Sequence, residues 1–200
     1  MVTISKEHIA QLPLIHWEGP VRVLNTVAEM REAVQEILES GETHLCFDTE
    51  TKPVFRRGDY NRPALVQLAT ATTVYLFRIC KINHSFVHLL PLLTDHSILK
   101  TGVSILDDVK ELQRVERFAA AGFVDCSTVT VNKQMCIHNM GLQAMAAHFL
   151  QGRINKGKTI SNWASPVLTA SQIRYAATDA WVSREAYVRA LADGRRVRGR

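Results

Sequence analysis

The sequence predicts an α/β domain in which helices cover both faces of a mixed β-sheet. Three observations lead to this prediction. The apolar residues change their spacing along the chain, from the period of a helix to the alternation of a strand and back. Two strand-like segments separated by a short polar turn indicate an antiparallel hairpin. Helical and strand-like segments then alternate, which is typical of layered α/β folds.

The first half of the chain predicts strands around one capped helix. Thr26 and Glu29 have the spacing of a capping box at the start of this helix, and Gly41 follows its end. The expected segments, in chain order, are a strand at 21–25, a helix between Thr26 and Gly41, a strand at 43–51, and a hairpin of strands at 64–70 and 74–79.

Helices dominate the second half. The last helix has the strongest start, because Thr169 and Gln172 form a capping box and Leu168 and Ile173 stand at the positions of a hydrophobic staple. Gly194 is expected to end it. The expected segments are helices at 86–93, 105–117, 142–150 and 169–192, with strands at 98–103 and 123–126. The sheet would therefore hold about five or six strands.

The composition fits one compact globular domain. The 200 residues are 46% hydrophobic and 22% charged, which excludes a disordered or fibrous chain. Lys and Arg number 24 against 19 Asp and Glu, and the net charge of +5 leans mildly towards polyanionic partners. No apolar run approaches the roughly 18 residues of a membrane helix, so we expect no membrane association. We expect an intracellular protein, cytoplasmic, or nuclear if its source is eukaryotic.

The cysteines and the chain ends complete this outline. The four cysteines show neither CxxC spacing nor the density of a secreted scaffold, so we expect them to be reduced and buried without a zinc site. We expect residues 1–20 to form an N-terminal extension, residues 21–193 the domain, and residues 194–200 a frayed basic tail.

Two acidic residues interrupt the apolar strand at 43–51. Asp48 and Glu50 are two residues apart, which places both side chains on one face at a separation of roughly 6 to 7 Å. Burying such like charges is costly unless a cation or hydrogen-bond donors compensate them, and a divalent metal is a suitable partner. An edge strand with a hydrated polar face is an equally open interpretation.

A third acid follows the strand at 98–103, where Asp107 and Asp108 compete for the role. At about 100° per residue, the apolar stripe of the helix at 105–117 lies beside Asp108 and nearly opposite Asp107. We therefore predict that Asp108 faces the site and that Asp107 faces solvent.

A fourth acid lies on the last helix. Asp179 follows Tyr175 by four residues, so both side chains share one helix face. The small residues Ala176, Ala177 and Ala180 would let this helix approach the sheet closely. Alone, such a pair of residues more often belongs to an ordinary helix surface. The pair indicates a functional site only in combination with the other acids.

These segments together resemble the 3'-5' exonucleases of the DnaQ-like, ribonuclease H-like superfamily, in the branch with a tyrosine in its third motif (DEDDy). Residues 47–51 are similar to the first motif, Asp108 with Leu112 to the second, and residues 175–179 to the third. Three flanking segments are similar to ribonuclease D and Werner-type exonuclease domains, namely residues 63–68, 161–163 and 168–175.

The resemblance implies a ribonuclease H-like fold and a two-metal phosphodiesterase that releases nucleoside 5'-monophosphates from 3' ends. By this analogy, Tyr175 orients the attacking water, and two Mg²⁺ or Mn²⁺ ions are held by Asp48, Glu50, Asp108 and Asp179. The implied substrate is single-stranded or 3'-recessed DNA or RNA. The alternatives are a catalytically silent nucleic-acid-binding module on the same fold and a structure-specific endonuclease.

The resemblance also implies contacts with the terminal nucleotide. Thr51 matches the position whose backbone meets the terminal sugar, and Val54 matches an apolar wedge against the last base. Further candidates for nucleic-acid contact are Thr49, Arg56, Arg57, Lys156 and Lys158. For the basic residues, solvated loop charges without a ligand are an equally open interpretation.

Three other residue types receive no catalytic role. We expect Trp163 to pack in the core rather than to stack on a base. His138 and His148 lack metal-ligand spacing, and Asp125 is expected to serve a cap or a turn.

Overall fold

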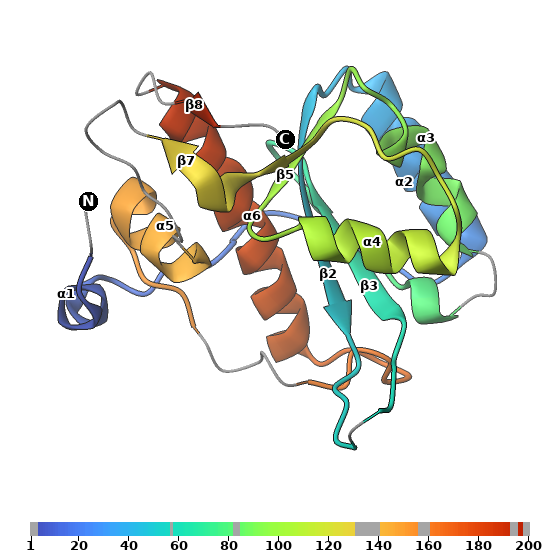
Figure 1. Ribbon diagram of the computed structural model, residues 1–200, viewed down its shortest axis with the longest axis horizontal. Coiled ribbons are helices and arrows are strands. Elements are labelled where there is room, and N and C mark those ends of the chain that lie inside the picture. Colours follow the sequence, from blue (N-terminus) through green and yellow to red (C-terminus); the bar gives the residue numbers. More distant parts are fainter. Residues whose placement is uncertain are drawn as a thin grey trace.

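The computed structural model describes residues 4–56, 58–81, 85–130, 141–155, 161–192 and 196–197. Its main body is a mixed sheet of six strands, with a separate two-stranded sheet (Figure 1). The strands are β1 (Val21–Leu24), β2 (His44–Thr51), β3 (Pro63–Ala69), β4 (Val74–Phe77), β5 (Leu99–Gly102), β6 (Phe123–Asp125), β7 (Val129–Thr130) and β8 (Arg196–Val197). The α-helices are α1 (Lys6–Gln11), α2 (Val27–Glu39), α3 (Leu90–Leu93), α4 (Leu106–Val115), α5 (Leu142–Leu150) and α6 (Ala170–Ala192).

The large sheet has the strand order β1-β4-β3-β2-β5-β6. β2, β3 and β4 pair antiparallel, whereas β1 on β4, β5 on β2 and β6 on β5 pair parallel. The predicted hairpin is therefore β3–β4, and the predicted mixed sheet is confirmed.

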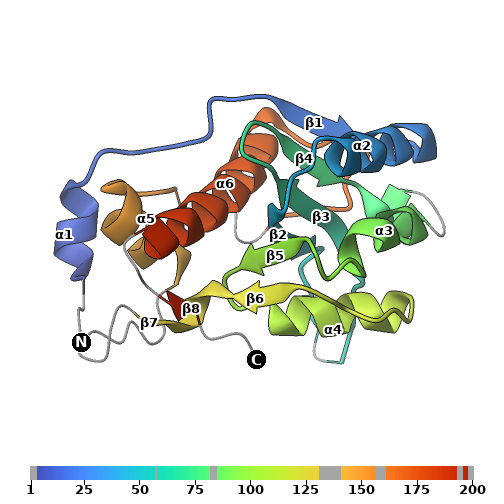
Figure 2. The ribbon, with the colours of Figure 1, turned by 90° about the horizontal axis from the view of Figure 1, so that it is seen from above.

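Helices cover both faces of this sheet, as Figures 1 and 2 show from two directions. On one face, Phe47 and Val66 belong to an apolar cluster that continues into α2, α3 and α4. On the other face, Cys46 and Leu65 pack with the small residues of α6, including Ala177. Because neighbouring strand residues point to opposite faces, the alternation in β2 decides which helices each side chain meets.

The predicted helix starts are present. The Thr26 hydroxyl accepts a hydrogen bond from the Glu29 amide, and the Glu29 carboxylate accepts one from the Thr26 amide at 2.9 Å. Thr169 and Gln172 exchange the equivalent pair of bonds at the start of α6. Such capping boxes satisfy amides that the first helical turn leaves unpaired, so α2 and α6 begin where local chemistry directs.

The segment before β1, which the sequence predicts as an N-terminal extension, contains a helix and contacts with the domain. It contains α1, whose start is capped by the Ser5 hydroxyl. Leu14 then forms a parallel bridge with Arg153, and the Trp17 amide donates to the Thr178 hydroxyl of α6 at 3.2 Å. The N-terminal segment therefore lies against the face of α6 that no strand covers.

Two local predictions are wrong. Residues 196–197 of the expected frayed tail form β8, whose backbone pairs antiparallel with β7. Cys80 is exposed, whereas Cys46 and Cys126 are buried as expected, and Cys136 lies outside the described residues. The expected short helix at 86–93 is present as a 3-10 helix over Ser85–Leu89 that continues into α3, with Pro91 in the first turn of α3, where proline is tolerated. Within the part of the chain that the structure describes, no helix has the length and apolar character needed to cross a bilayer.

Candidate active site

Asp48 and Glu50 lie at the end of β2 where the sheet opens. β2 pairs with β3 along nearly its whole length, but its pairing with β5 ends at Cys46. The two acids follow Cys46 on the face covered by α6. Because they lie beyond the end of the pairing with β5, they have a neighbouring strand on one side only. The strand is therefore central at its start and has one open edge at its acidic end, while a metal partner for the two acids stays a prediction.

The end of β5 brings a second element to this open edge. A side chain at Gly102 would collide with the Phe47 carbonyl, since an added Cβ would lie 2.2 Å from that oxygen. Ser104 adopts a left-handed backbone with φ of 61°, and the chain then enters α4. Gly102 thus permits the close strand contact, and the turn that follows places the first residues of α4 beside the end of β2.

The structure separates the two neighbouring aspartates of α4. The Asp107 side chain is 88% exposed and pairs with Lys110 at 2.7 Å. Asp108 turns inward and accepts a hydrogen bond from the Thr49 hydroxyl of β2. This geometry agrees with the helix-face prediction, while a catalytic role for Asp108 stays a prediction. The Thr49 contact was not foreseen, and it engages a hydroxyl that the sequence had suggested for nucleic-acid binding.

Asp179 and Tyr175 lie on α6. This helix covers the face of the sheet opposite to the one that α4 covers. Ala176, Ala177 and Ala180 are buried at 0%, 1% and 0% exposure, so α6 lies close to β2 and β3 as expected. Asp179 is itself buried. Burial raises the pKa of Asp179 to about 7, although hydrogen bonding with Tyr175 acts in the other direction. Asp179 therefore holds a proton up to nearly neutral pH, which is unusual for a carboxyl group.

Asp108 and Asp179 both lie within electrostatic reach of Asp48 and Glu50. Burial raises the pKa of Asp48 well above its usual range, and the charges of Asp108 and Asp179 raise it further. Burial likewise raises the pKa of Glu50 to about 9, with added contributions from the other three acids. Burial also raises the pKa of Asp108. Three distant parts of the chain thus bring like charges to one place, where full ionisation is unfavourable without positive charge.

The acids are near one another but do not form a finished cation site. Among the described residues, no group of three or more His, Cys, Asp or Glu side chains is arranged so that it could hold a metal ion. The carboxylates therefore gather as a cluster whose side chains would have to turn towards a shared ion.

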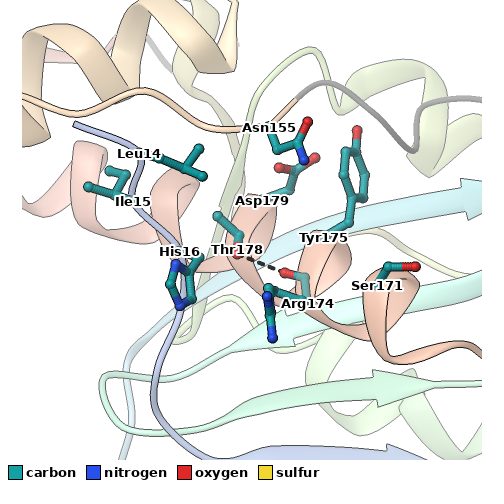
Figure 3. A pocket seen from close by; sticks show the side chains of 9 residues that line it. All are labelled: Leu14, Ile15, His16, Asn155, Ser171, Arg174, Tyr175, Thr178 and Asp179. Carbon is teal, nitrogen blue, oxygen red and sulfur yellow. Dashed lines mark hydrogen bonds between the residues drawn. The ribbon is translucent and has the colours of Figure 1, made fainter. Parts of the chain in front are cut away.

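A pocket of about 270 Å³ lies beside this cluster (Figure 3). One wall is α6, with Tyr175, Thr178 and Asp179, and the other wall is the N-terminal segment. Leu14, Ile15, His16, Asn155, Ser171 and Arg174 complete the lining. The sequence offered no signal for this wall, because its contacts join residues about 160 positions apart, such as Trp17 and Thr178.

The segment before α6 is tied down by a buried arginine. Arg78 follows β4, is 1% exposed, and donates to the carbonyls of Pro166 and Ser165. Gln172 donates to the Ser161 hydroxyl at 2.8 Å, and Trp163 is fully buried, which confirms the packing prediction. These contacts fix the start of the helix that carries Tyr175.

The remaining candidates stay predictions. Thr51 and Arg56 are exposed, and Val54 is 44% exposed, in or just beyond the end of β2. Arg57, Lys156 and Lys158 lie outside the described residues, as does His138. Asp125 accepts hydrogen bonds from the amides of Ser104 and Ser127, each at 2.9 Å, in agreement with a turn role.

Comparisons with known proteins support the architecture. Residues 21–189 match the model of a family described as 3'-5' exonuclease. The bifunctional 3'-5' exonuclease/ATP-dependent helicase WRN of Mus musculus is 31% identical over 176 residues, which are 85% of this chain and 12% of that protein. The chain thus spans a small part of this relative.

Two solved structures have the same fold. The catalytic core of RRP6 from Trypanosoma brucei superposes with a TM-score of 0.75 at 21% identity, covering 86% of this chain and 46% of that one. RNase D of the same organism, in complex with RNA U12, gives 0.71 at 20% identity, covering 87% and 62%. The expected ribonuclease H-like fold is confirmed.

Proposed function

Because the chain belongs to the 3'-5' exonuclease family, we propose that it is a metal-dependent hydrolase that shortens nucleic acids from the 3' end. It cleaves the terminal phosphodiester bond and releases a nucleoside 5'-monophosphate. Its substrate is single-stranded or 3'-recessed DNA or RNA, and the RNase D that shares its fold was solved with an RNA. We place it in the cytoplasm, or in the nucleus of a eukaryote, where such 3' ends occur.

The observation that supports this proposal is the gathering of four acids from three distant segments. Asp48 and Glu50 come from β2, and the charges of Asp108 and Asp179 contribute to the raised pKa of both. A purely structural role would not require uncompensated like charges at the open end of a sheet.

The donor set fits two divalent cations. Carboxylate oxygens are the ligands that Mg²⁺ and Mn²⁺ take in proteins. The groups that shift the pKa of Glu50 are all carboxylates, so positive charge from outside the chain would relieve the cluster. Asp48, Glu50, Asp108 and Asp179 would hold the ions. When bound, the ions supply a water of lowered pKa and stabilise the charge that develops on the leaving oxygen.

The side chains around the acids orient the reactants. Tyr175 is hydrogen-bonded with Asp179 and lines the adjoining pocket, so its hydroxyl is positioned to hold the attacking water. The Thr49 hydroxyl fixes Asp108 in its inward orientation. Both roles keep the reacting groups in place, which is a large part of catalysis in phosphoryl transfer.

The nucleic-acid contacts follow the end of β2. We assign the terminal sugar to the Thr51 backbone and the last base to Val54, which is 44% exposed and free to meet it. Arg56, together with Arg57, Lys156 and Lys158 outside the described residues, would follow the phosphates.

The proposal is tested with a 5'-labelled single-stranded oligonucleotide and Mn²⁺. Stepwise shortening from the 3' end, with release of mononucleotides, is the expected result. Retention of the label without shortening would favour the silent binding module. A circular single strand serves as control, because an exonuclease needs an end and an endonuclease would cut the circle.

A further inference from the structure

The loop between β2 and β3 exposes a set of large apolar side chains. Phe55 is 82% exposed, Tyr60 is 53% exposed, and Val54 adds a partly exposed aliphatic side chain. They line a hollow of about 340 Å³ together with Lys52, Pro53, Arg56, Asp59 and Asn61. A group of exposed apolar side chains in one loop is typical of an interaction surface.

The charge of the same loop suggests what covers it. Lys52 and Arg56 line the hollow, and neither takes part in an ion pair among the described residues. Exposed aromatic rings beside unpaired cations are the combination that holds single-stranded nucleic acid, because bases stack on the rings and phosphates meet the cations. A protein partner would need no such pairing of rings with positive charge.

The frame of the loop is held in place while its rings stay accessible. The Asn61 side chain donates to the carbonyls of Lys52 and Pro53 at 3.0 and 3.2 Å, which ties the two arms together. The Tyr60 hydroxyl donates to Glu111 on α4 at 2.7 Å. α4 also carries Asp108, so the loop is fixed to an element of the acid cluster. Less entropy is then lost when a strand binds.

The loop is also close to the acids along the chain. Phe55 follows Glu50 by five residues, a span of at most about 18 Å when extended. In Figure 1 the loop projects from the end of the sheet at which β2 terminates and α6 begins. A strand whose last nucleotide lies at the carboxylates would therefore pass the loop with its preceding nucleotides.

We propose that Phe55 and Tyr60 form a stacking surface for the bases that precede the terminal nucleotide, and that this surface selects the single-stranded 3' end from the two kinds of substrate proposed above. A base that stacks on Phe55 cannot at the same time remain paired and stacked in a duplex. The proposal rests on the proposed exonuclease function for the position of the terminal nucleotide. It adds the stacking surface and narrows the proposed substrates to the single strand.

The test compares binding of an oligonucleotide with hydrolysis of a substrate that contains a single nucleotide. Binding of a fluorescein-labelled single-stranded oligonucleotide and of a blunt hairpin is measured by anisotropy in EDTA. Hydrolysis of the p-nitrophenyl ester of thymidine 5'-monophosphate with Mn²⁺ reports the acid cluster alone, since this substrate has no preceding base. The variants are Phe55→Ala, Phe55→Trp and, as a matched exposed apolar control, Leu191→Ala, which is 48% exposed at the far end of α6.

We expect Phe55→Ala to weaken single-strand binding roughly 5- to 150-fold, which corresponds to the loss of one stacked base. Phe55→Trp keeps an aromatic ring and should retain binding, and Leu191→Ala should bind normally. All three variants should hydrolyse the ester like the wild type. The wild type should bind the single strand more tightly than the blunt hairpin.

Normal single-strand binding by Phe55→Ala would overturn the proposal and leave the loop to a protein partner. Equal binding of the hairpin would overturn the selection of the single-stranded 3' end. If the wild type binds through Phe55 but hydrolyses neither the ester nor an oligonucleotide, the exonuclease function is wrong and the stacking surface stands.

Discussion

The charged groups at the two ends of β2 differ, although α6 packs against both ends. At one end opposite charges form a pair, and at the other end like charges gather. At the first end, Arg184 of α6 pairs with Glu42 at 3.3 Å and donates to the His44 carbonyl. At the last end, Asp179 of the same helix lies near the acids of β2, and the charges of Asp179 and Asp108 raise the pKa of both Asp48 and Glu50.

This difference indicates that one end of β2 stabilises the fold and that the other end serves binding or catalysis. The Glu42–Arg184 pair balances its own charge, and burial together with Arg184 lowers the pKa of His44 to about 4, so the imidazole is neutral near pH 7. The acid cluster instead gathers like charges, which is a cost that a protein keeps where it serves binding or catalysis. We therefore expect substitutions at the two ends to have opposite effects on stability and activity.

The largest effect is expected from removing an acid of the cluster. Asp48→Asn and Asp179→Asn should each lower exonuclease activity at least about 1000-fold, because a bound metal contributes several kcal/mol of charge stabilisation. Their melting temperature should not fall, since each change removes a charge that the neighbouring acids oppose. Initial rates on a labelled oligonucleotide and thermal melts measure the two properties.

The two aspartates of α4 provide the matched control. Asp107→Asn changes an exposed side chain and should alter activity by no more than about twofold, as ordinary surface substitutions do. Asp108→Asn should resemble Asp48→Asn. Greater damage from Asp107→Asn than from Asp108→Asn would show that the wrong aspartate has been placed in the site.

A smaller effect of the opposite kind is expected at the other end of β2. Arg184→Met should lower the free energy of unfolding by about 2 kcal/mol, because it leaves Glu42 without its partner. This is below the cost for a fully buried pair, since the Glu42 side chain is 17% exposed. Activity of the folded protein, measured well below its melting temperature, should stay near that of the wild type.

Arg22→Met is the control for this change. Arg22 also pairs with glutamates, namely Glu32 and Glu36, but their side chains are 71% and 49% exposed. Its loss should cost less than about 1 kcal/mol. If chemical denaturation gives the two arginine variants the same stability, the contrast between a buried and an exposed pair is not what stabilises this end of the sheet.

Local chemistry explains which of these features the sequence could predict. The caps of α2 and α6 depend on residues three positions apart, and the choice between Asp107 and Asp108 depends on one helical turn. The alternation in β2 likewise placed Asp48 and Glu50 on one face. Each of these inferences needs only the geometry of a single element.

The features that the sequence could not predict join distant parts of the chain. Thr49 and Asp108 are separated by 59 positions, Arg78 and Pro166 by 88, and Glu42 and Arg184 by 142. The end of the β2–β5 pairing at Cys46, which opens one side of the acid pair, is also a property of the assembled sheet. Tertiary packing decides such contacts, and no periodicity encodes them.

The dependence of stability on pH also differs between the two ends of β2, which predict slopes of opposite sign. Folding raises the pKa of Glu50 from 4.5 to about 9, so the folded state keeps a proton that the unfolded chain has released between these values. Stability from this group is complete below pH 4.5 and is lost as the pH rises towards 9. Folding lowers the pKa of His44 from 6.5 to about 4, so its contribution is complete above pH 6.5 and is lost as the pH falls towards 4.

Divalent ions should change only the pH dependence of stability that comes from Glu50. Mn²⁺ at about ten times its Kd should add about 1.4 kcal/mol, or about 3 to 6 °C in melting temperature, and the gain should grow with pH because only ionised carboxylates bind the ion. Glu50→Gln should flatten the decline of stability at high pH and reduce the metal effect, while the His44 slope at low pH stays unchanged. Melts at several pH values with and without Mn²⁺ provide the measurement, and a metal-induced shift that is equal at all pH values would show that the ion binds away from Glu50.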